Sequence, residues 1–149
     1  MTTENLPFEI AETSHAIRRA FDRRAAHLGV TRAQWRVLAW LSRQPGLRQV
    51  ELADHLDIEP ITLCRIVDRL QDGELVERRR DPEDRRAWRL HLTDKAGPLV
   101  EQLRSLAATM AEEAFAGLPP ATIATVRDAL SRVRDNLNSP AVAPTRISA

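Results

Sequence analysis

Cysteine is nearly absent from this chain of 149 residues, which contains Cys64 alone. A single cysteine cannot form an intrachain disulfide or the Cys-x-x-Cys motif of redox and zinc sites. The sequence also lacks any run of about 18 consecutive apolar residues, the length that a membrane-spanning helix requires. Its first ten residues do not combine a basic segment with an apolar core, as a secretory signal would. We therefore expect a cytoplasmic protein with no membrane partner.

Lysine is equally scarce, since the 22 basic residues are 21 arginines and Lys95. Acidic residues number 21, so the formal net charge is only +1 and does not by itself indicate a nucleic-acid partner. The charge is unevenly distributed, however. The stretch RRRDPEDRRAWRL at residues 78–90 carries six arginines and three acids. Positive charge is therefore concentrated in this one segment.

The first part of the chain predicts two helices. Residues 9–28 carry apolar side chains at helical spacing, with arginines on the opposite side. A second helix should begin at Arg32, because Thr31 and Gln34 have the spacing of a capping box. It should end near the QPG sequence at residues 44–46.

Residues 49–78 predict two short helices joined by a tight turn. In the first, we expect Val50, Ala53 and Leu56 to face the core. The second begins at Pro60, which suits a first turn because proline lacks an N–H. Its buried stripe comprises Leu63, Ile66, Val67 and Leu70. Its outward face, which has no partner in this pattern, comprises Ile61, Thr62, Arg65, Asp68 and Arg69.

After Gly73 the apolar pattern changes to alternation, which is typical of strands. Residues 76–80 and 88–92 should pair as a hairpin, with DPEDRR forming the turn between them. We expect three tryptophans in the core: Trp35, Trp40 and Trp88. A helix pair followed by a hairpin with a charged tip predicts a winged helix-turn-helix, a mainly α fold with a small β-hairpin wing.

The C-terminal part predicts two further helices. One should run from Thr93, its N-cap, to Gly117, with Pro98 marking either a kink or the true start of its regular part. After the LPP sequence at residues 118–120, a final helix carries a heptad-type seam without a partner in the winged core. The seam comprises Ile123, Val126, Leu130, Val133 and Leu137. Residues 138–149 have the composition of a disordered tail.

The outward face of the helix that begins at Pro60 has the side chains that read DNA bases. Arg65 can donate two hydrogen bonds to O6 and N7 of a guanine, and Thr62 is short enough to allow close approach to the major groove. Ile61 could touch a thymine methyl, and Arg69 is better placed for a phosphate. We expect this helix to be a recognition helix.

We expect the wing to contact DNA at places other than those that the recognition helix contacts. Arg86 can enter a narrow minor groove, where the negative potential is enhanced, if the nearby carboxylate of Asp84 fixes its direction. Phosphate contacts add affinity and salt sensitivity without reading sequence. Their predicted donors are Arg78, Arg79, Arg80, Arg85 and Arg89.

Residues 31–96 resemble the MarR family of bacterial transcriptional regulators, and within it the SlyA-like branch. The specific part is DPEDRRAWRLHLT following a helix-turn-helix with GELVER. The resemblance implies a homodimer that reads a pseudopalindromic operator in double-stranded DNA and acts as a repressor. It also implies a small, often phenolic, effector that binds between the dimer helices and the DNA-binding lobe and relieves repression.

The resemblance divides the chain into four parts. These are a dimerisation helix (residues 1–30), a winged lobe (31–92), C-terminal dimerisation helices (93–137) and a tail (138–149). A twofold partner would bury the apolar residues that lie outside the winged core. The predicted dimer interface comprises Ile10, Ile17, Phe21, Ile123, Val126, Leu130, Val133 and Leu137.

Three alternatives remain open. Cys64, where the family has more often a small aliphatic residue, is either a small core residue or a redox sensor. A cysteine enzyme using Cys64 with His55 and Asp57 has little support, because no Gly-rich elbow or oxyanion donor accompanies them. The winged module could also serve protein contacts. We expect no enzyme activity, no catalytic residues, no cofactor and no metal, since the four histidines lack ligand spacing.

Overall fold

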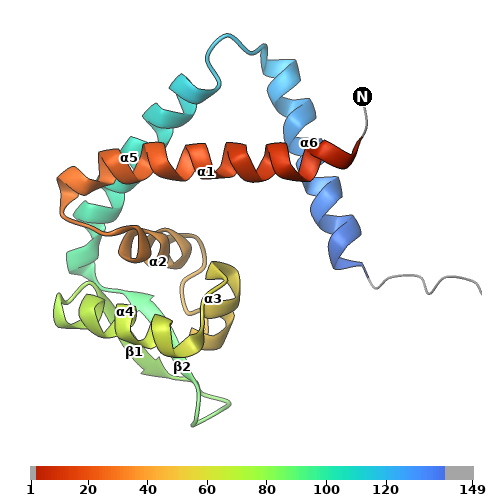
Figure 1. Ribbon diagram of the computed structural model, residues 1–149. Helices are drawn as coiled ribbons and strands as arrows, with labels where there is room; N and C mark the ends of the chain where they lie inside the picture. The colour runs from red at the N-terminus through yellow and green to blue at the C-terminus, as the bar shows by residue number, and fades with distance from the viewer. Residues whose placement is uncertain (1–2, 140–149) are drawn as a thin grey trace, which may run out of the picture. The chain divides into compact units, whose positions relative to one another are not determined.

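The computed structural model describes residues 3–139, which form helices and one antiparallel hairpin (Figure 1). The chain divides into two units within helix α5 (Gly97–Ala114), the first ending at Ala111 and the second beginning at Glu112. The core lies in the first unit and combines side chains of its helices and of both strands. The predicted mainly α winged helix-turn-helix fold is confirmed.

Helix α1 spans Leu6–Ala25 and is followed by a 3₁₀ turn at Ala26–Leu28. The prediction of a helix over residues 9–28 is therefore confirmed in place, although the helix begins three residues earlier and its last turn is tighter. The turn ends at Gly29, whose φ of 74° is in the left-handed region that glycine adopts most easily.

Helix α2 spans Arg32–Arg43 and begins with the predicted capping box. The Gln34 N–H donates to Thr31 Oγ1 at 3.2 Å, and the Thr31 N–H donates to Gln34 Oε1 at 3.0 Å. The side chains of Val37, Leu38 and Leu41 are fully buried. This helix is therefore the centre of the core, and it faces α1, α3 (Gln49–Leu56), α4 (Pro60–Asp72) and strand β2 (Trp88–Leu92).

Helices α3 (Gln49–Leu56) and α4 (Pro60–Asp72) are joined by a turn in which Asp57 adopts a φ of 53°. The prediction that Val50 faces the core is wrong, since Val50 is 62% exposed and Leu52 is buried instead. The inward face of this short helix is set by Leu52 and Leu56, which are four residues apart, and Val50 lies about 200° around the helix from Leu52.

The inward stripe of α4 is confirmed, with one qualification. Leu63, Val67 and Leu70 are buried in the core, whereas Ile66 is partly buried against it. The outward residues predicted for DNA reading are exposed. The helix therefore separates an apolar face from a polar one as its spacing predicts.

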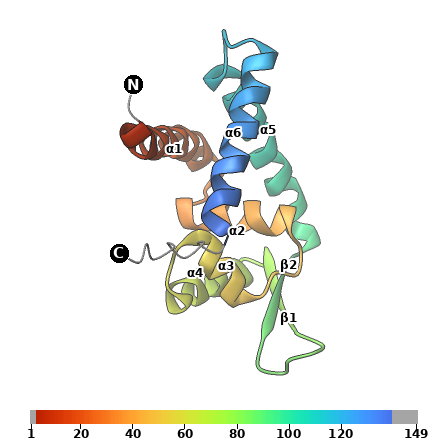
Figure 2. The same ribbon diagram turned by 90° about the vertical axis from the view of Figure 1, so that its right-hand side faces the viewer.

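Strands β1 (Val76–Arg80) and β2 (Trp88–Leu92) have the predicted bounds and pair antiparallel, Val76 opposite Leu92 and Arg80 opposite Trp88. We call these strands and the intervening turn at residues 81–87 the wing. Figures 1 and 2 both show it extending away from helices α2 to α4.

The prediction that Trp88 belongs to the core is wrong. Trp88 is 39% exposed, and the guanidinium carbon of Arg80 lies 5.2 Å from its ring centroid. Trp88 is the first residue of β2 and lies at its outer end, two residues before Leu90, the β2 side chain that is fully buried. Trp35 and Trp40 are partly buried and pack against the core.

Pro98 lies in the first turn of α5 (Gly97–Ala114). A 3₁₀ turn at Asp94–Ala96, with Thr93 at its N-cap position, precedes this helix. Pro98 therefore marks the true start of the regular helix, where a missing N–H disrupts nothing. Helix α6 spans Pro120–Asn138. Asn138, the first residue of the predicted tail, is therefore the last residue of a helix, and residues 140–149 of that tail lie outside the described part of the chain. Among residues 3–139 no helix combines the length and apolarity needed to span a membrane.

Candidate nucleic-acid interface

The outward face of α4 presents Ile61, Thr62, Arg65 and Arg69, all exposed. Ile61 is 67% exposed, although an apolar side chain of this size is usually covered. Among residues 3–139, the guanidinium groups of Arg65 and Arg69 have no hydrogen-bond or ion-pair partner. The face therefore holds donors that are available to a partner outside the chain.

Arg78, predicted to contact phosphate, is instead bound inside the lobe. Its side chain is only 15% exposed and lies 2.7 Å from Asp68 Oδ1. It also donates to Gln71 Oε1 at 2.7 Å, to Gln49 Oε1 at 3.3 Å and to the Cys64 carbonyl oxygen at 3.3 Å. Arg78 thus joins β1 to both α3 and α4, and it has little surface left for a phosphate.

The remaining arginines of the wing differ in whether their side chains have partners within the chain. Arg79 forms an exposed ion pair with Glu77, two residues away on the same strand. Arg80 stacks on Trp88 and donates to the Arg85 carbonyl oxygen at 3.4 Å. Within the described residues the guanidinium groups of Arg85 and Arg86 have no partner. The tip of the wing therefore carries two exposed, unpaired positive charges.

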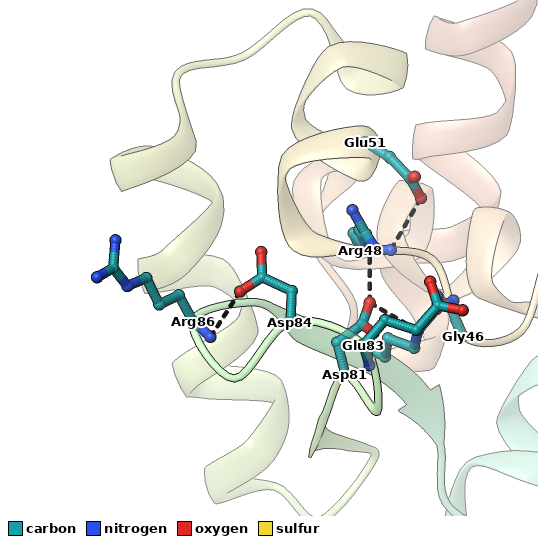
Figure 3. A network of polar contacts seen from close by, with 8 residues as sticks. Gly46, Arg48, Glu51, Asp81, Glu83, Asp84 and Arg86 are labelled. Carbon is teal, nitrogen blue, oxygen red and sulfur yellow. Dashed lines mark hydrogen bonds and ion pairs between the residues drawn. The ribbon is translucent and has the colours of Figure 1, made fainter.

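The predicted pairing of the Asp84 and Arg86 side chains is wrong. Asp84 Oδ1 accepts a hydrogen bond from the backbone N–H of Arg86 at 3.0 Å, and the Asp84 carbonyl oxygen accepts from the Ala87 N–H at 3.0 Å. Figure 3 shows the guanidinium of Arg86 pointing away from Asp84. Asp84 therefore shapes the backbone of the turn, as aspartate does in Asx turns, and does not direct the arginine.

Within the turn of the wing, the carboxylate that pairs with arginines is Asp81, which sequence reasoning missed. Asp81 is 2% exposed, and its Oδ2 accepts from Arg48 Nε at 2.8 Å (Figure 3). The same oxygen lies 3.0 Å from Arg89 Nε. Its Oδ1 accepts from the Glu83 N–H at 2.9 Å. We call Asp81, Arg48, Arg89 and the Glu83 N–H the Asp81 cluster. Arg48 precedes Asp81 by 33 residues, so no sequence spacing could have indicated the pair.

The electrostatics of this cluster follow from its contacts. The Glu83 N–H and the two guanidinium groups lower the pKa of Asp81 below its ordinary value, although burial acts in the opposite direction. The Asp81 carboxylate raises the pKa of Arg48 in turn. Arg89, another predicted phosphate donor, also donates to the Gly46 carbonyl oxygen at 3.0 Å. Its side chain is thus committed to the base of the wing.

A cavity of about 290 Å³ lies in the first unit. Its walls are mostly apolar and come from α1, α2 and α5. Trp35 forms part of the wall, and its ring is held by a hydrogen bond from Nε1 to Asp22 Oδ1 at 2.8 Å. The polar lining comprises Arg18, Ser42, Arg43 and Arg104. The cavity therefore combines an apolar interior with three cationic side chains.

The residues predicted for a dimer interface are mostly uncovered. On α1, Ile10 is 41% and Ile17 is 37% exposed, whereas Phe21 is 7% exposed and packs on Trp35 with ring centroids 4.4 Å apart. Phe21 therefore has almost no surface left for a partner. On α6, Ile123 is partly buried, and the rest of the seam is exposed: Val126, Leu130, Val133 and Leu137.

Cys64 is partly buried, and its Sγ lies 3.6 Å from Arg78 Nη2. His55, its partner in the enzyme alternative, instead stacks on Trp40 with ring centroids 4.3 Å apart. Burial lowers the pKa of His91. No three His, Cys, Asp or Glu side chains of the described residues are grouped so that they could hold a metal ion.

The comparisons with known proteins agree with this architecture. A model of the MarR family matches residues 28–87. The chain is similar to the transcriptional regulator PA3341, with 35% identity and a TM-score of 0.83 over 91% of this chain and 99% of the other. It is also similar to a MarR transcriptional regulator from Methanosarcina mazei Go1, with 25% identity and a TM-score of 0.80 over 90% of this chain and 96% of the other.

A third similar structure is a MarR family transcriptional regulator from Listeria monocytogenes complexed with a 26mer DNA. It shares 22% identity and a TM-score of 0.77 over 87% of this chain and 86% of the other. At that identity the likeness shows the fold alone.

Proposed function

The chain belongs to the MarR family, and from that premise we propose that it is a transcriptional repressor that binds operator DNA as a homodimer and releases it to a small effector. The observation that carries this proposal is that two neighbouring elements each present arginines whose guanidinium groups have no partner within residues 3–139. Arg65 and Arg69 lie on the exposed face of α4, and Arg85 and Arg86 lie at the tip of the wing.

The exposed face of α4 suits the major groove. Arg65 can donate to O6 and N7 of a guanine, Thr62 leaves room for approach, and Ile61 can meet a thymine methyl. Arg69, one turn further along the helix, reaches a phosphate more easily than a base edge. We therefore assign base reading to the first half of α4.

The wing suits the adjacent minor groove. Arg86 is exposed and unpaired on a turn that Asp84 shapes, and a narrow minor groove attracts such a side chain. Arg79, Arg80 and Arg85 are exposed nearby and can contact phosphates. The Listeria monocytogenes protein of the same fold was solved with DNA, which supports DNA binding by this chain.

Dimerisation would cover the apolar residues of α1 and α6. Ile10 and Ile17, with Phe8 at 73% exposure, leave α1 uncovered, and four residues of the α6 seam are exposed as well. Two copies related by a twofold axis can bury such surfaces symmetrically. We assign residues 1–30 and 93–137 to this role and residues 31–92 to DNA. A pseudopalindrome with half-sites about 34–36 Å apart would match the dimer.

The cavity beside Trp35 is our proposed effector site. Its volume of about 290 Å³ is close to the lower limit for small-ligand sites. An aromatic ring fits its apolar walls, and a phenolate or carboxylate group fits Arg18, Arg43 or Arg104. We expect such a compound to shift the dimer to a form with lower operator affinity, which titration of a protein–operator complex with small phenolic acids would measure.

The experiment that tests DNA recognition is selection of bound duplexes from a random pool by the purified protein, followed by sequencing. Enrichment of a pseudopalindrome with half-sites one helical turn apart is the expected result. Recovery of random sequences, with only salt-sensitive bulk binding, would overturn the proposal and favour a winged module that serves protein contacts.

A further inference from the structure

We propose that Asp81 is a specificity-determining positioning residue of the wing, because it fixes the wing against α3 and withholds the guanidinium groups of Arg48 and Arg89 from DNA phosphates. The inference rests on the proposed DNA binding and adds a residue that never touches DNA. It also means that Arg48 and Arg89 are kept from DNA, whereas Arg85 and Arg86 at the wing tip are available to it.

The Asp81 cluster joins three parts of the lobe. Asp81 is the first residue after β1, Arg48 precedes the first turn of α3, and Arg89 belongs to β2. The carboxylate side chain is fully inaccessible to solvent and contacts Arg48 and the Glu83 N–H (Figure 3). It also pairs with the Arg89 guanidinium. A buried carboxylate that accepts two hydrogen bonds and pairs with a second guanidinium resists displacement, since displacement would leave its charge unpaired in a dry environment.

Backbone hydrogen bonds reinforce this junction. The Gly46 N–H donates to the Leu90 carbonyl oxygen, and the Leu90 N–H donates to the Leu47 carbonyl oxygen, both at 2.9 Å. Arg48 and Arg89 form an antiparallel bridge. The segment before α3 thus pairs with β2 through an isolated β-bridge, and Asp81 joins the side chains at this bridge.

The same residue also sets the turn that carries the exposed arginines. The Asp81 N–H donates to the Ala87 carbonyl oxygen at 3.1 Å and closes the turn, while Asp81 Oδ1 fixes the Glu83 N–H inside it. Arg85 and Arg86 lie between these points. Their placement relative to α4 therefore depends on the attachment of the wing at Asp81.

The cluster also controls how many arginines near the wing can reach DNA phosphates. The side chains of Arg48 and Arg89 are 32% and 36% exposed, so they lie close enough to the surface to turn outward if the carboxylate is lost. Each arginine that gains a phosphate contact steepens the dependence of log affinity on log salt by about one unit. Loss of Asp81 should thus strengthen binding to any DNA while it weakens selection of the operator.

The test compares Asp81→Asn with wild type on the selected operator and on a random duplex of equal length, over a range of salt concentrations. Asparagine is nearly isosteric and can still accept the Glu83 N–H. For the variant we expect random-DNA affinity to rise severalfold, its salt slope to steepen by about one to two units, and the ratio of operator to random affinity to fall about tenfold.

The matched control is Glu83→Gln, which makes the same change of charge at an exposed side chain of the same turn. We expect it to alter both affinities by a similar factor, with the ratio preserved. If Asp81→Asn behaves like this control, or if it weakens both DNAs without steepening the salt slope, the inference is wrong. If wild type itself shows no preference for any operator, the proposed function fails first, and the two failures are distinguishable.

A second variant covers the possibility that Asp81→Asn does not fold. Arg48→Gln removes one partner of the carboxylate and leaves the Arg89 pair in place. Because Arg48 is withheld from phosphate in the wild type, its loss should leave random-DNA affinity unchanged and lower operator affinity. Arg79→Gln, at an exposed arginine, should weaken both. If Arg48→Gln weakens random DNA as much as Arg79→Gln does, Arg48 is a phosphate contact and the inference is overturned.

Discussion

The guanidinium of Arg78 lies 2.7 Å from the carboxylate of Asp68, so a side chain of the wing is paired with a residue of the exposed half of α4. Together with the Asp81 cluster, this contact attaches the wing at two places, one on α4 and one at the start of α3. The two candidate reading elements, α4 and the wing, are therefore held as one body.

Arg78→Ala should lower both the free energy of unfolding and operator affinity. The variant leaves Asp68, Gln71 and the Cys64 carbonyl oxygen without their shared donor, which we expect to cost about 1–3 kcal/mol of stability. Urea unfolding measures this loss. The salt slope of DNA binding should stay the same, and a slope shallower by about one unit would mean that Arg78 contacts phosphate after all.

Arg65→Ala should relax sequence preference. Loss of a bidentate contact to guanine should cost about 1–3 kcal/mol on the best operator and little on random DNA. Affinities for a set of operators with single base changes measure this effect. Arg79→Ala is the comparison, since it should weaken all sequences alike and make the salt slope shallower. Equal losses on every duplex for Arg65→Ala would remove Arg65 as a base reader.

Arg86→Ala should mainly weaken operators with A·T-rich flanks, where the minor groove is narrow and its negative potential is strongest. The measurement is operator affinity for duplexes that differ only in their flanks. Arg85→Ala, at the adjacent exposed arginine, should weaken both flanks alike. A preference for A·T flanks that survives Arg86→Ala would assign minor-groove contact to another side chain.

How far the sequence predicts this architecture depends on the range of the interactions involved. The capping box of Thr31 and the bounds of both strands depend on neighbours within a few residues, and they are predicted correctly. The exposure of Val50 and Trp88 depends on which side of a short element meets the core, and both predictions are wrong.

The roles of the wing arginines are the hardest to predict, because identical residues in one stretch have different partners. Arg78 and Arg89 are bound by side chains or carbonyls from the start of α3 and the segment before it, whereas Arg85 and Arg86 are unpaired within residues 3–139. Only the folded chain brings Gln49, Arg48 and Gly46 to the wing. Sequence spacing indicated the wrong carboxylate for the same reason.

Leu130→Asp should produce monomers and abolish tight operator binding, because one lobe makes only half of the contacts. Leu130 lies in the middle of the α6 seam and is 36% exposed, so the substitution should not disturb the core of one chain. Sedimentation velocity measures the assembly. Thr125→Asp adds the same charge on another side of α6 and should leave a dimer. An unchanged dimer for Leu130→Asp would show that the interface lies elsewhere.

Acid should weaken the attachment of the wing. Since the pKa of Asp81 in the folded chain is lowered from its ordinary value of 3.8, the stabilising contribution of its carboxylate is complete above the unfolded pKa. It is lost as the pH falls through the lowered folded pKa. Unfolding free energies measured at decreasing pH should therefore decline less steeply for Asp81→Asn than for wild type. Parallel pH profiles for the two proteins would contradict this role.

Sequence-selective binding by a dimer is tested most directly by one comparison. The affinity of the wild-type protein for its selected operator is measured against that for a shuffled duplex of the same base composition, at an ionic strength of about 0.15 M. We predict a ratio of at least about a thousand, with two chains bound to each operator duplex. Equal affinities for the two duplexes would contradict sequence reading by α4 and the wing.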